Sequence, residues 1–291
     1  MNKHMRRVAE EVSKNILTEE EYESYKELPF FDEGHGYDIF GFEKESGMLS
    51  VVMGKFLYEK YFRVESFGRE NIPKKTRGML VCNHSGIVPI DGAMIFMDCL
   101  LKLKPPRAIR AVVDRFFMGF PFVGMLLRRM GQINGMKRDF QELLRREELT
   151  LVFPEGTHGV GKHFSQRYKL ERFGVGFLEI ALSERTPLIP TCVVGAEEQA
   201  PMIFNIKPLA RLLGFPYFPV TPTFPHLGPL GIFPLPVKYR IYYGEPLYLH
   251  EKYSPDIIDN PAKIMELVEE VKSTVQQMIN KGLEERAGIF V

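Results

Sequence analysis

Residues 78–92 read GMLVCNHSGIVPIDG, an apolar run that breaks abruptly into a polar loop. LTLVFPEGTHG at 149–159 has the same form, and PLIPTCVVGAEE at 187–198 is a third example. Short apolar runs that end in polar turns are typical of buried strands in a parallel sheet. Helical patterns lie between them, over 91–103, 140–148 and 176–183. We therefore predict an α/β fold with a largely parallel or mixed sheet flanked by helices.

The chain divides into two predicted regions. Residues 1–60 form an N-terminal helical extension, whose spacing over 48–61 leads into a strand at 61–67. Residues 61–291 form the main domain, which has a last strand at 238–243 and a C-terminal helix at about 260–285. Asn260 and Pro261 suit the cap and the first position of that helix.

Composition indicates a globular protein in a reducing compartment. The chain has 291 residues, of which 45% are hydrophobic, enough for a sizeable core. Cys82, Cys99 and Cys192 are an odd, widely spaced set, which argues against a disulfide framework. No signal peptide or membrane-spanning helix is expected, because no apolar stretch is long enough. We expect a peripheral protein on the cytoplasmic face of a membrane.

The net charge of +1 conceals a strong asymmetry. Residues 18–45 contain ten acidic side chains, whereas residues 102–138 contain nine basic ones around the apolar run FFMGFPFVGMLL at 116–127. Cations that flank an apolar wedge suit an anionic lipid surface, although a buried helix–turn–helix with solvated ends would also fit. The basic residues are Lys102, Lys104, Arg107, Arg110, Arg115, Arg128, Arg129, Lys137 and Arg138.

Residues 201–236, which we call the proline-rich arm, contain nine prolines and six aromatic residues. Proline at this density excludes a long helix or a central strand. The arm is therefore expected to line a pocket, cap the core or contact a membrane.

His84 is the leading candidate for chemistry. It follows a strand and has Asp91 seven residues on, and a carboxylate can orient an imidazole as a general base. A purely structural loop histidine is the alternative. A nucleophile at Cys82 or Ser85 is disfavoured, because neighbours at one strand end seldom face each other and the Gly-x-Ser-x-Gly elbow is missing.

The loop after the second strand allows three readings. Gly156 to Lys162 has P-loop spacing, but His163 replaces the Ser or Thr that would bind magnesium. A metal site formed by Glu155, His158 and His163 would need a helix that the flanking glycines and Pro154 oppose. The third reading is a tight turn that presents backbone N–H groups and the Glu155 and Thr157 side chains to a polar ligand.

Taken together and in order, four motifs over roughly residues 60–250 resemble the glycerolipid acyltransferase superfamily, also called the PlsC-like or lysophospholipid acyltransferase family. They are NHSGIVPIDG, GQINGMKR, LVFPEGTHG and PLIPTCVVGAEE. The resemblance implies a PlsC-like fold. The longer spacing between His84 and Asp91 resembles the branch related to monoacylglycerol acyltransferases, and His158 stands where that superfamily commonly has an arginine.

The resemblance also implies roles for single residues. His84 would deprotonate a lipid hydroxyl that attacks an acyl thioester, Asp91 would orient His84, and either Lys137 or Arg138 would bind a phosphate. No metal or cofactor is implied beyond acyl-CoA or acyl carrier protein as co-substrate. The implied partners are membrane lipids, anionic ones above all, and not nucleic acid. The substrate-binding candidates are Asn83, Ser85, Lys137, Arg138, Phe153, Pro154, Glu155, Gly156 and Thr157.

The function predicted from the sequence is therefore transfer of a fatty acyl group to the hydroxyl of a glycerolipid or lysophospholipid. Two rivals stay open. One is a catalytically silent lipid-binding or membrane-remodelling protein on the same scaffold, which the intact His84, Asp91 and Glu155 disfavour. The other is a lipid hydrolase that uses Cys82 or Ser85.

Overall fold

The computed structural model describes residues 3–32, 34–86, 90–113, 118–215 and 217–291. Within these residues, seven strands form one sheet in the order β1-β9-β6-β2-β5-β3-β4. Neighbouring strands run parallel except for β6 and β9, so the predicted α/β fold with a largely parallel sheet is confirmed. The strands are β1 (Glu65–Phe67), β2 (Gly78–Cys82), β3 (Ile109–Val113), β4 (Ile133–Asn134), β5 (Leu149–Val152), β6 (Leu188–Val194) and β9 (Arg240–Tyr243).

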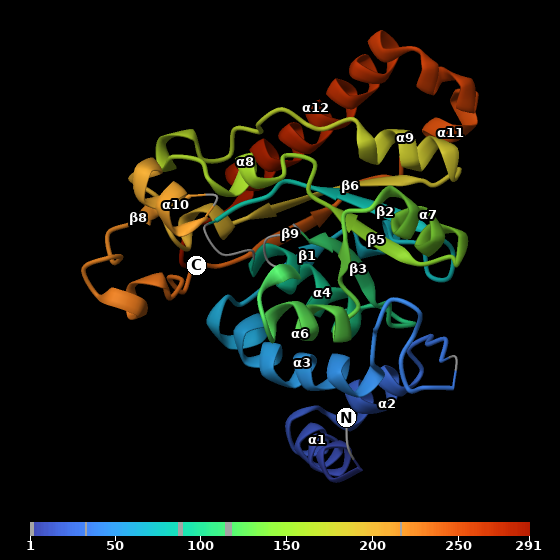
Figure 1. Cartoon of the computed structure of the whole chain (residues 1–291), viewed down its shortest axis with the longest axis vertical. Coiled ribbons are helices and arrows are strands. Elements are labelled where there is room, and N and C mark those ends of the chain that lie inside the picture. The colour runs from blue at the N-terminus through green and yellow to red at the C-terminus, as the bar shows by residue number, and fades with distance from the viewer. Residues whose placement is uncertain (1–2, 33, 87–89, 114–117, 216) are drawn as a thin grey trace.

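Helices cover both faces of the sheet. Figure 1 shows α3, α4 and α6 on one side of it and α7, α9 and α12 on the other. Among the helices described, none combines the length and apolar character needed to cross a membrane. The α-helices are α1 (Lys3–Ile16), α2 (Glu19–Lys26), α3 (Lys44–Phe56), α4 (Ile90–Lys102), α6 (Val123–Arg129), α7 (Lys137–Arg145), α8 (Thr157–Val160), α9 (Gly176–Ser183), α10 (Lys207–Leu213), α11 (Leu249–Lys252) and α12 (Pro261–Glu285). A π-helical turn η1 (Leu57–Tyr61) extends α3, and the 3₁₀ turns are η2 (Arg69–Asn71), η3 (Phe164–Gln166), η4 (Ala196–Glu198), η5 (Gly228–Ile232) and η6 (Pro255–Asp259).

Strand β2 lies at the centre of two hydrophobic cores. Leu80 and Cys82 point into the core beneath α3 and α4, whereas Met79 and Val81 point into the core beneath α7, α9 and α12. This alternation follows from the period of two in a strand, and a strand buried on both faces must be apolar throughout. The run at 78–82 is apolar for this reason.

Several elements match the predictions closely, but the strand predicted at 61–67 is shorter, only Glu65–Phe67, and residues 102–138, which we call the basic segment, differ from the helix–turn–helix alternative. The predicted strand at 78–82 and helix at 176–183 have the predicted bounds, and the Asn260 side chain accepts the Lys263 N–H as the predicted cap. The basic segment is not a helix–turn–helix, because it contributes β3 and β4 to the sheet with α6 between them. Phe116 and Phe117 of the predicted wedge, and the flanking Arg115, lie outside the described residues.

Acidic residues of 18–45 form ion pairs with basic residues of 102–138. Asp38 pairs with the guanidinium of Arg110, Glu20 pairs with Lys104, and Glu43 lies 3.9 Å from Arg129. Arg107 is also buried, and its guanidinium donates to backbone carbonyls. The acidic extension thus packs on the basic segment, which leaves less free positive charge for a lipid surface than the sequence indicates.

The proline-rich arm forms a small unit of its own beside the sheet. A short strand β7 (Phe204–Asn205) pairs antiparallel with β8 (Pro219–Val220), and α10 lies between them. The arm leaves the sheet after β6 and returns to it at β9, and in Figure 1 it projects beyond the sheet at the left. As predicted, the described residues of the arm contain no long helix and no strand of the main sheet.

The ion pair between Asp38 and Arg110 should contribute strongly to stability, because the Arg110 side chain is almost completely buried. Asp38→Ala leaves an uncompensated charge inside the protein and should lower the free energy of unfolding by about 3–5 kcal/mol. Lys104→Gln removes an exposed pair and should cost under about 1 kcal/mol. Urea denaturation measures both, and equal losses would contradict this assignment.

Candidate active site

The polar loops of the sequence meet at one edge of the sheet. β2 is hydrogen bonded to β5 on one side and β6 on the other, all three parallel, so their carboxyl ends lie side by side. Ligand sites of open α/β sheets form at this edge. The loops that leave here begin at Asn83, Phe153 and Gly195, and they carry the residues that the sequence analysis singled out.

His84 and Asp91 are in direct contact. The Nδ1 atom of His84 lies 2.9 Å from Oδ2 of Asp91. The same oxygen accepts the Ser85 N–H, and Oδ1 accepts the Gly92 N–H, so both carboxylate oxygens act as acceptors. Nδ1 must then donate its proton, which leaves Nε2 of a neutral ring as an acceptor. Asp91 is completely buried, whereas 14% of the His84 side chain is exposed.

The loop after β2 has a backbone position that requires glycine. Gly86 has a φ of +82°, and a Cβ atom there would lie 2.3 Å from Nε2 of Gln199, so the position requires glycine. Residues 87–89 lie outside the described chain. The chain then enters α4, whose first turn carries Asp91.

Helix α4 is anchored at its middle by a second buried carboxylate. Asp98 accepts hydrogen bonds from the hydroxyl groups of Tyr58, Ser66 and Tyr243, and Arg69 lies 3.7 Å away. These partners come from η1, β1, β9 and η2, so Asp98 joins α4 to four other elements. A helix fixed in this way holds Asp91 in place.

Phe153 lies against the imidazole. The ring centroids of Phe153 and His84 are 4.1 Å apart, with an angle of 21° between the ring planes. The Phe153 ring also lies close to Gly92 at the start of α4. A side chain from the end of β5 thus fixes the orientation of the imidazole that Asp91 holds by one nitrogen.

Glu155 fixes the backbone of His84. Its Oε1 atom accepts the His84 N–H at 3.0 Å, and its Oε2 atom accepts the Glu171 N–H at 2.7 Å. The carboxylate is buried and has Lys162 as its counter-ion, with Nζ 3.4 Å from Oε2. Glu155, a substrate-binding candidate in the sequence analysis, thus positions the backbone of the histidine.

Lys162 and Glu197 were not identified from the sequence. Nζ of Lys162 lies 3.1 Å from Glu197 Oε1, so one buried ammonium bridges two buried carboxylates. Desolvation by burial raises the pKa of Glu197 to about 7. Lys162 is the lysine of the P-loop-like spacing, and that spacing was the sequence feature that could have marked it as a site residue. Its two carboxylate partners are apparent only in the fold.

The remaining predicted residues of the three loops have defined positions. The Asn83 amide accepts from the Val193 N–H and donates to its carbonyl, which ties β2 to β6. Ser85 is buried, and the Pro154 carbonyl accepts the Gly174 N–H. Gly156 has a φ of +57° in the tight turn, and the exposed Thr157 begins α8. Their roles in substrate binding remain predictions.

Lys137 and Arg138 lie apart from these loops. Both are exposed at the start of α7, after the edge strand β4, and Nζ of Lys137 is 3.7 Å from Oε2 of Glu179. In the sheet, β5 and β3 separate β4 from β2. Within the described chain, no hydrogen bond or ion pair links either cation to His84 or Glu155.

Neither candidate nucleophile is arranged for attack. The Cys82 thiol is buried, and burial raises its pKa, which disfavours the reactive thiolate. The Ser85 hydroxyl lies 3.5 Å from Asp91 Oδ2. Among the described residues, neither group hydrogen bonds to the His84 ring, as a histidine-activated nucleophile would require.

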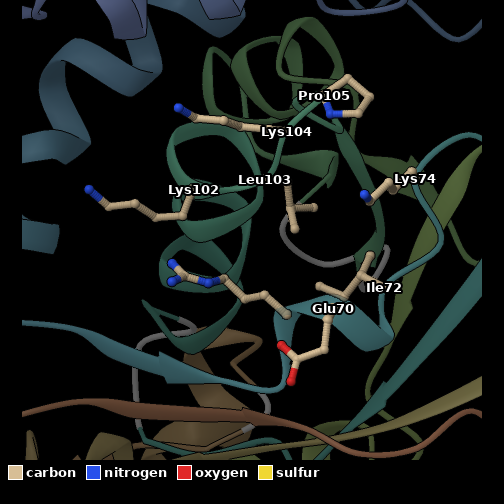
Figure 2. A pocket seen from close by; sticks show the side chains of 8 residues that line it. Glu70, Ile72, Lys74, Lys102, Leu103, Lys104 and Pro105 are labelled. Atoms are coloured by element: carbon tan, nitrogen blue, oxygen red, sulfur yellow. The ribbon is translucent and has the colours of Figure 1, made fainter.

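A cavity of about 170 Å³ at the other end of α4 is separate from this site. Arg69, Lys74, Lys102 and Lys104 line it, but Figure 2 shows the Lys102 and Lys104 side chains directed outward, away from Leu103. Asp91 lies in the first turn of α4 and Lys102 in the last, which separates the cavity from the His84 pair by most of the helix length. These cations therefore do not lie beside His84 and Asp91.

Close packing around His84 should make Gly159 irreplaceable. A Cβ atom there would lie 2.9 Å from the His84 carbonyl oxygen and 3.0 Å from the His84 Cβ. Gly159→Ala should therefore lower the free energy of unfolding by about 1–3 kcal/mol, as overpacking does. Gly176→Ala, with no atom within 4 Å of the added carbon, is the matched control and should be neutral or slightly stabilising in urea denaturation. The same loss in both variants would refute the packing argument.

Glu197 should make stability depend on pH. The folded protein keeps this proton up to about pH 7, whereas an unfolded glutamate releases it near 4.5. The folded state binds more protons between these values, so stability should fall as pH rises through this window, by about 3 kcal/mol at most. Glu197→Gln cannot titrate and should gain stability relative to the parent over the same window. Parallel pH curves from urea denaturation would contradict this assignment.

Comparison with known proteins identifies the family. The family model described as "Acyltransferase" matches residues 63–194, which span His84, Asp91 and Glu155. An uncharacterized protein of Mycobacterium leprae is 40% identical over 255 residues, which cover 87% of this chain and 69% of the relative. A Gallus gallus protein named "DGAT1/2-independent enzyme synthesizing storage lipids" is 28% identical, over 86% of this chain and 68% of its own length.

The fold also has a solved counterpart. The crystal structure of the 1-acyl-sn-glycerophosphate acyltransferase PlsC from Thermotoga maritima aligns with a TM-score of 0.51 at 19% identity. The alignment covers 99% of this chain and 100% of that one. Together with the family match and the order of the four motifs, these relatives show that the chain belongs to the PlsC-like acyltransferase family.

Proposed function

We propose that this acyltransferase moves a fatty acyl group from an acyl thioester, acyl-CoA or acyl carrier protein, to a hydroxyl group of a glycerolipid. The observation that carries the proposal is the 2.9 Å contact between His84 Nδ1 and Asp91 Oδ2, which leaves Nε2 free to accept a proton. A lipid hydroxyl is a poor nucleophile until a base at hydrogen-bond distance removes its proton.

In the proposed reaction, the hydroxyl proton moves to Nε2 of His84 while the oxygen attacks the thioester carbonyl carbon. Asp91 stabilises the imidazolium that forms. The tetrahedral intermediate collapses, the carbon–sulfur bond breaks, and the leaving thiolate takes the proton from Nε2. The products are the ester and the free thiol, and no covalent acyl-enzyme forms.

The Gallus gallus relative is named as an enzyme that synthesizes storage lipids, and this name favours a neutral glycerolipid as the acceptor. The distance in the sheet between Lys137 or Arg138 and His84 also supports this choice, because a phosphate on the acceptor would find neither cation beside the base. The other substrate-binding candidates would then shape the site by positioning its loops and walls. They are Asn83, Ser85, Phe153, Pro154, Glu155, Gly156 and Thr157.

We further propose that the enzyme works at a membrane surface. The turn before α6 and the helix itself expose large apolar side chains, and the basic Arg128 and Arg129 follow them. Exposed apolar groups beside cations favour binding at a lipid interface. The exposed side chains are Phe120, Phe122, Val123, Met125 and Leu126.

Substitution of His84 tests the proposed chemistry. His84→Ala should lower acyl transfer by at least about 10²-fold while the protein stays folded, because the base is lost. Cys82→Ala and Ser85→Ala should retain most activity, because neither group attacks the thioester. The assay incubates labelled acyl-CoA or acyl carrier protein with monoacylglycerol, diacylglycerol and lysophospholipids and analyses the products by mass spectrometry.

Full activity of a folded His84→Ala variant would reject the base mechanism. Loss of activity in Ser85→Ala or Cys82→Ala, together with a trapped acyl-enzyme, would favour the hydrolase-like route. Binding of lipids without turnover in any donor and acceptor combination would favour the catalytically silent alternative.

A further inference from the structure

The proline-rich arm carries an unusual amount of exposed apolar surface. Leu212 is 82% exposed and Leu230 is 75% exposed, and seven further large apolar side chains of the arm are also exposed. Soluble proteins seldom expose so many large apolar side chains within one segment unless the segment contacts a partner or a membrane. The other seven are Ile203, Phe204, Leu213, Phe215, Leu227, Ile232 and Phe233.

The charge of the arm indicates which partner. Its sequence contains no aspartate and no glutamate, and its only lysine and arginine are Lys207 and Arg211, both on the exposed face of α10. A surface that combines apolar groups with positive charge and no negative charge is complementary to a leaflet that contains anionic phospholipid. A surface that binds a protein partner ordinarily has a polar rim around its apolar centre.

The position of the arm connects it to the candidate active site. It leaves the sheet at the carboxyl end of β6 and returns at the start of the antiparallel β9, the edge at which β2 presents His84. Nε2 of His163 lies 2.8 Å from the Ile203 carbonyl oxygen, and the Phe164 N–H donates to the Met202 carbonyl. The arm is thus bonded to the chain that follows Glu155, and Figure 1 shows α10 and α8 at the same end of the sheet.

We infer that the proline-rich arm is a second surface, besides the turn before α6 and α6 itself, by which the enzyme docks on an anionic lipid leaflet, and that it lies beside the loop that carries His84. The inference rests on the proposed function, because a glycerolipid acceptor is dissolved in that leaflet. The arm places its apolar side chains among the acyl chains and its two cations at the headgroups. An acceptor hydroxyl at the leaflet surface then reaches Nε2 of His84 without leaving the membrane entirely.

Vesicle binding by the full chain tests the inference. The double variant Leu212→Ser with Leu230→Ser should bind vesicles of phosphatidylcholine and phosphatidylglycerol at least about tenfold more weakly than the parent, because it loses apolar surface that enters the leaflet. The matched control is Phe31→Ser with Tyr37→Ser, which removes comparably exposed aromatic side chains from the N-terminal extension and should bind like the parent.

Two further variants separate this inference from the proposed chemistry. Lys207→Glu with Arg211→Glu should abolish the preference for vesicles that contain phosphatidylglycerol over vesicles of phosphatidylcholine alone. His84→Ala should bind vesicles like the parent but lose transfer. The leucine variant should lose transfer to vesicle-borne acceptor yet keep transfer to a short-chain acceptor dissolved as monomers.

Unchanged vesicle binding by the leucine variant would overturn the inference. A change in its oligomeric state by light scattering, with vesicle binding intact, would assign the surface to a second copy of the chain instead. If the parent transfers no acyl group to any acceptor, the proposed function fails, but the binding comparison still decides the role of the arm.

Discussion

The hydrogen bond between His84 and Asp91 is the interaction on which the candidate site depends. Asp91 is completely buried. Besides the imidazole N–H, its carboxylate oxygens accept the backbone N–H groups of Ser85 and Gly92. A carboxylate held in this way has one orientation, so it imposes one orientation and one tautomer on the histidine. The chemistry of the site then resides in a single free nitrogen, Nε2.

The sheet and its loops explain how two residues that are seven positions apart in the sequence are held in contact. Glu155 holds the His84 backbone from β5, Asn83 ties the end of β2 to β6, and Asp98 fixes α4. In each of these contacts, a buried polar side chain is hydrogen bonded to its partners. Breaking such a buried hydrogen bond costs free energy, so the contacts hold the site rigid. Rigid support of this kind is what precise catalytic geometry requires.

The edge of the sheet and the pairing of His84 with Asp91 could be predicted because both follow from local pattern. Apolar runs such as 78–82 report burial on two faces, and polar groups after parallel strands meet at one edge. The partners of Lys162 could not be predicted, because Glu197 lies in the turn η4 after β6, 35 residues further along the chain, and no periodicity links the two residues. Arg110 was misleading for the same reason: its charge indicated a surface, but Asp38, distant in sequence, neutralises it in the core.

The arm and the catalytic pair lie at the same edge, so one docking event would present both the base and a lipid-contacting surface to the acceptor. The central claim is that Asp91 leaves Nε2 of His84 as a proton acceptor. Nitrogen-15 NMR of the histidine-labelled protein measures this directly. The predicted result is a neutral His84 ring with a proton on Nδ1 and none on Nε2, a state that Asp91→Asn disturbs. A proton on Nε2 in the parent protein at the pH of activity would contradict it.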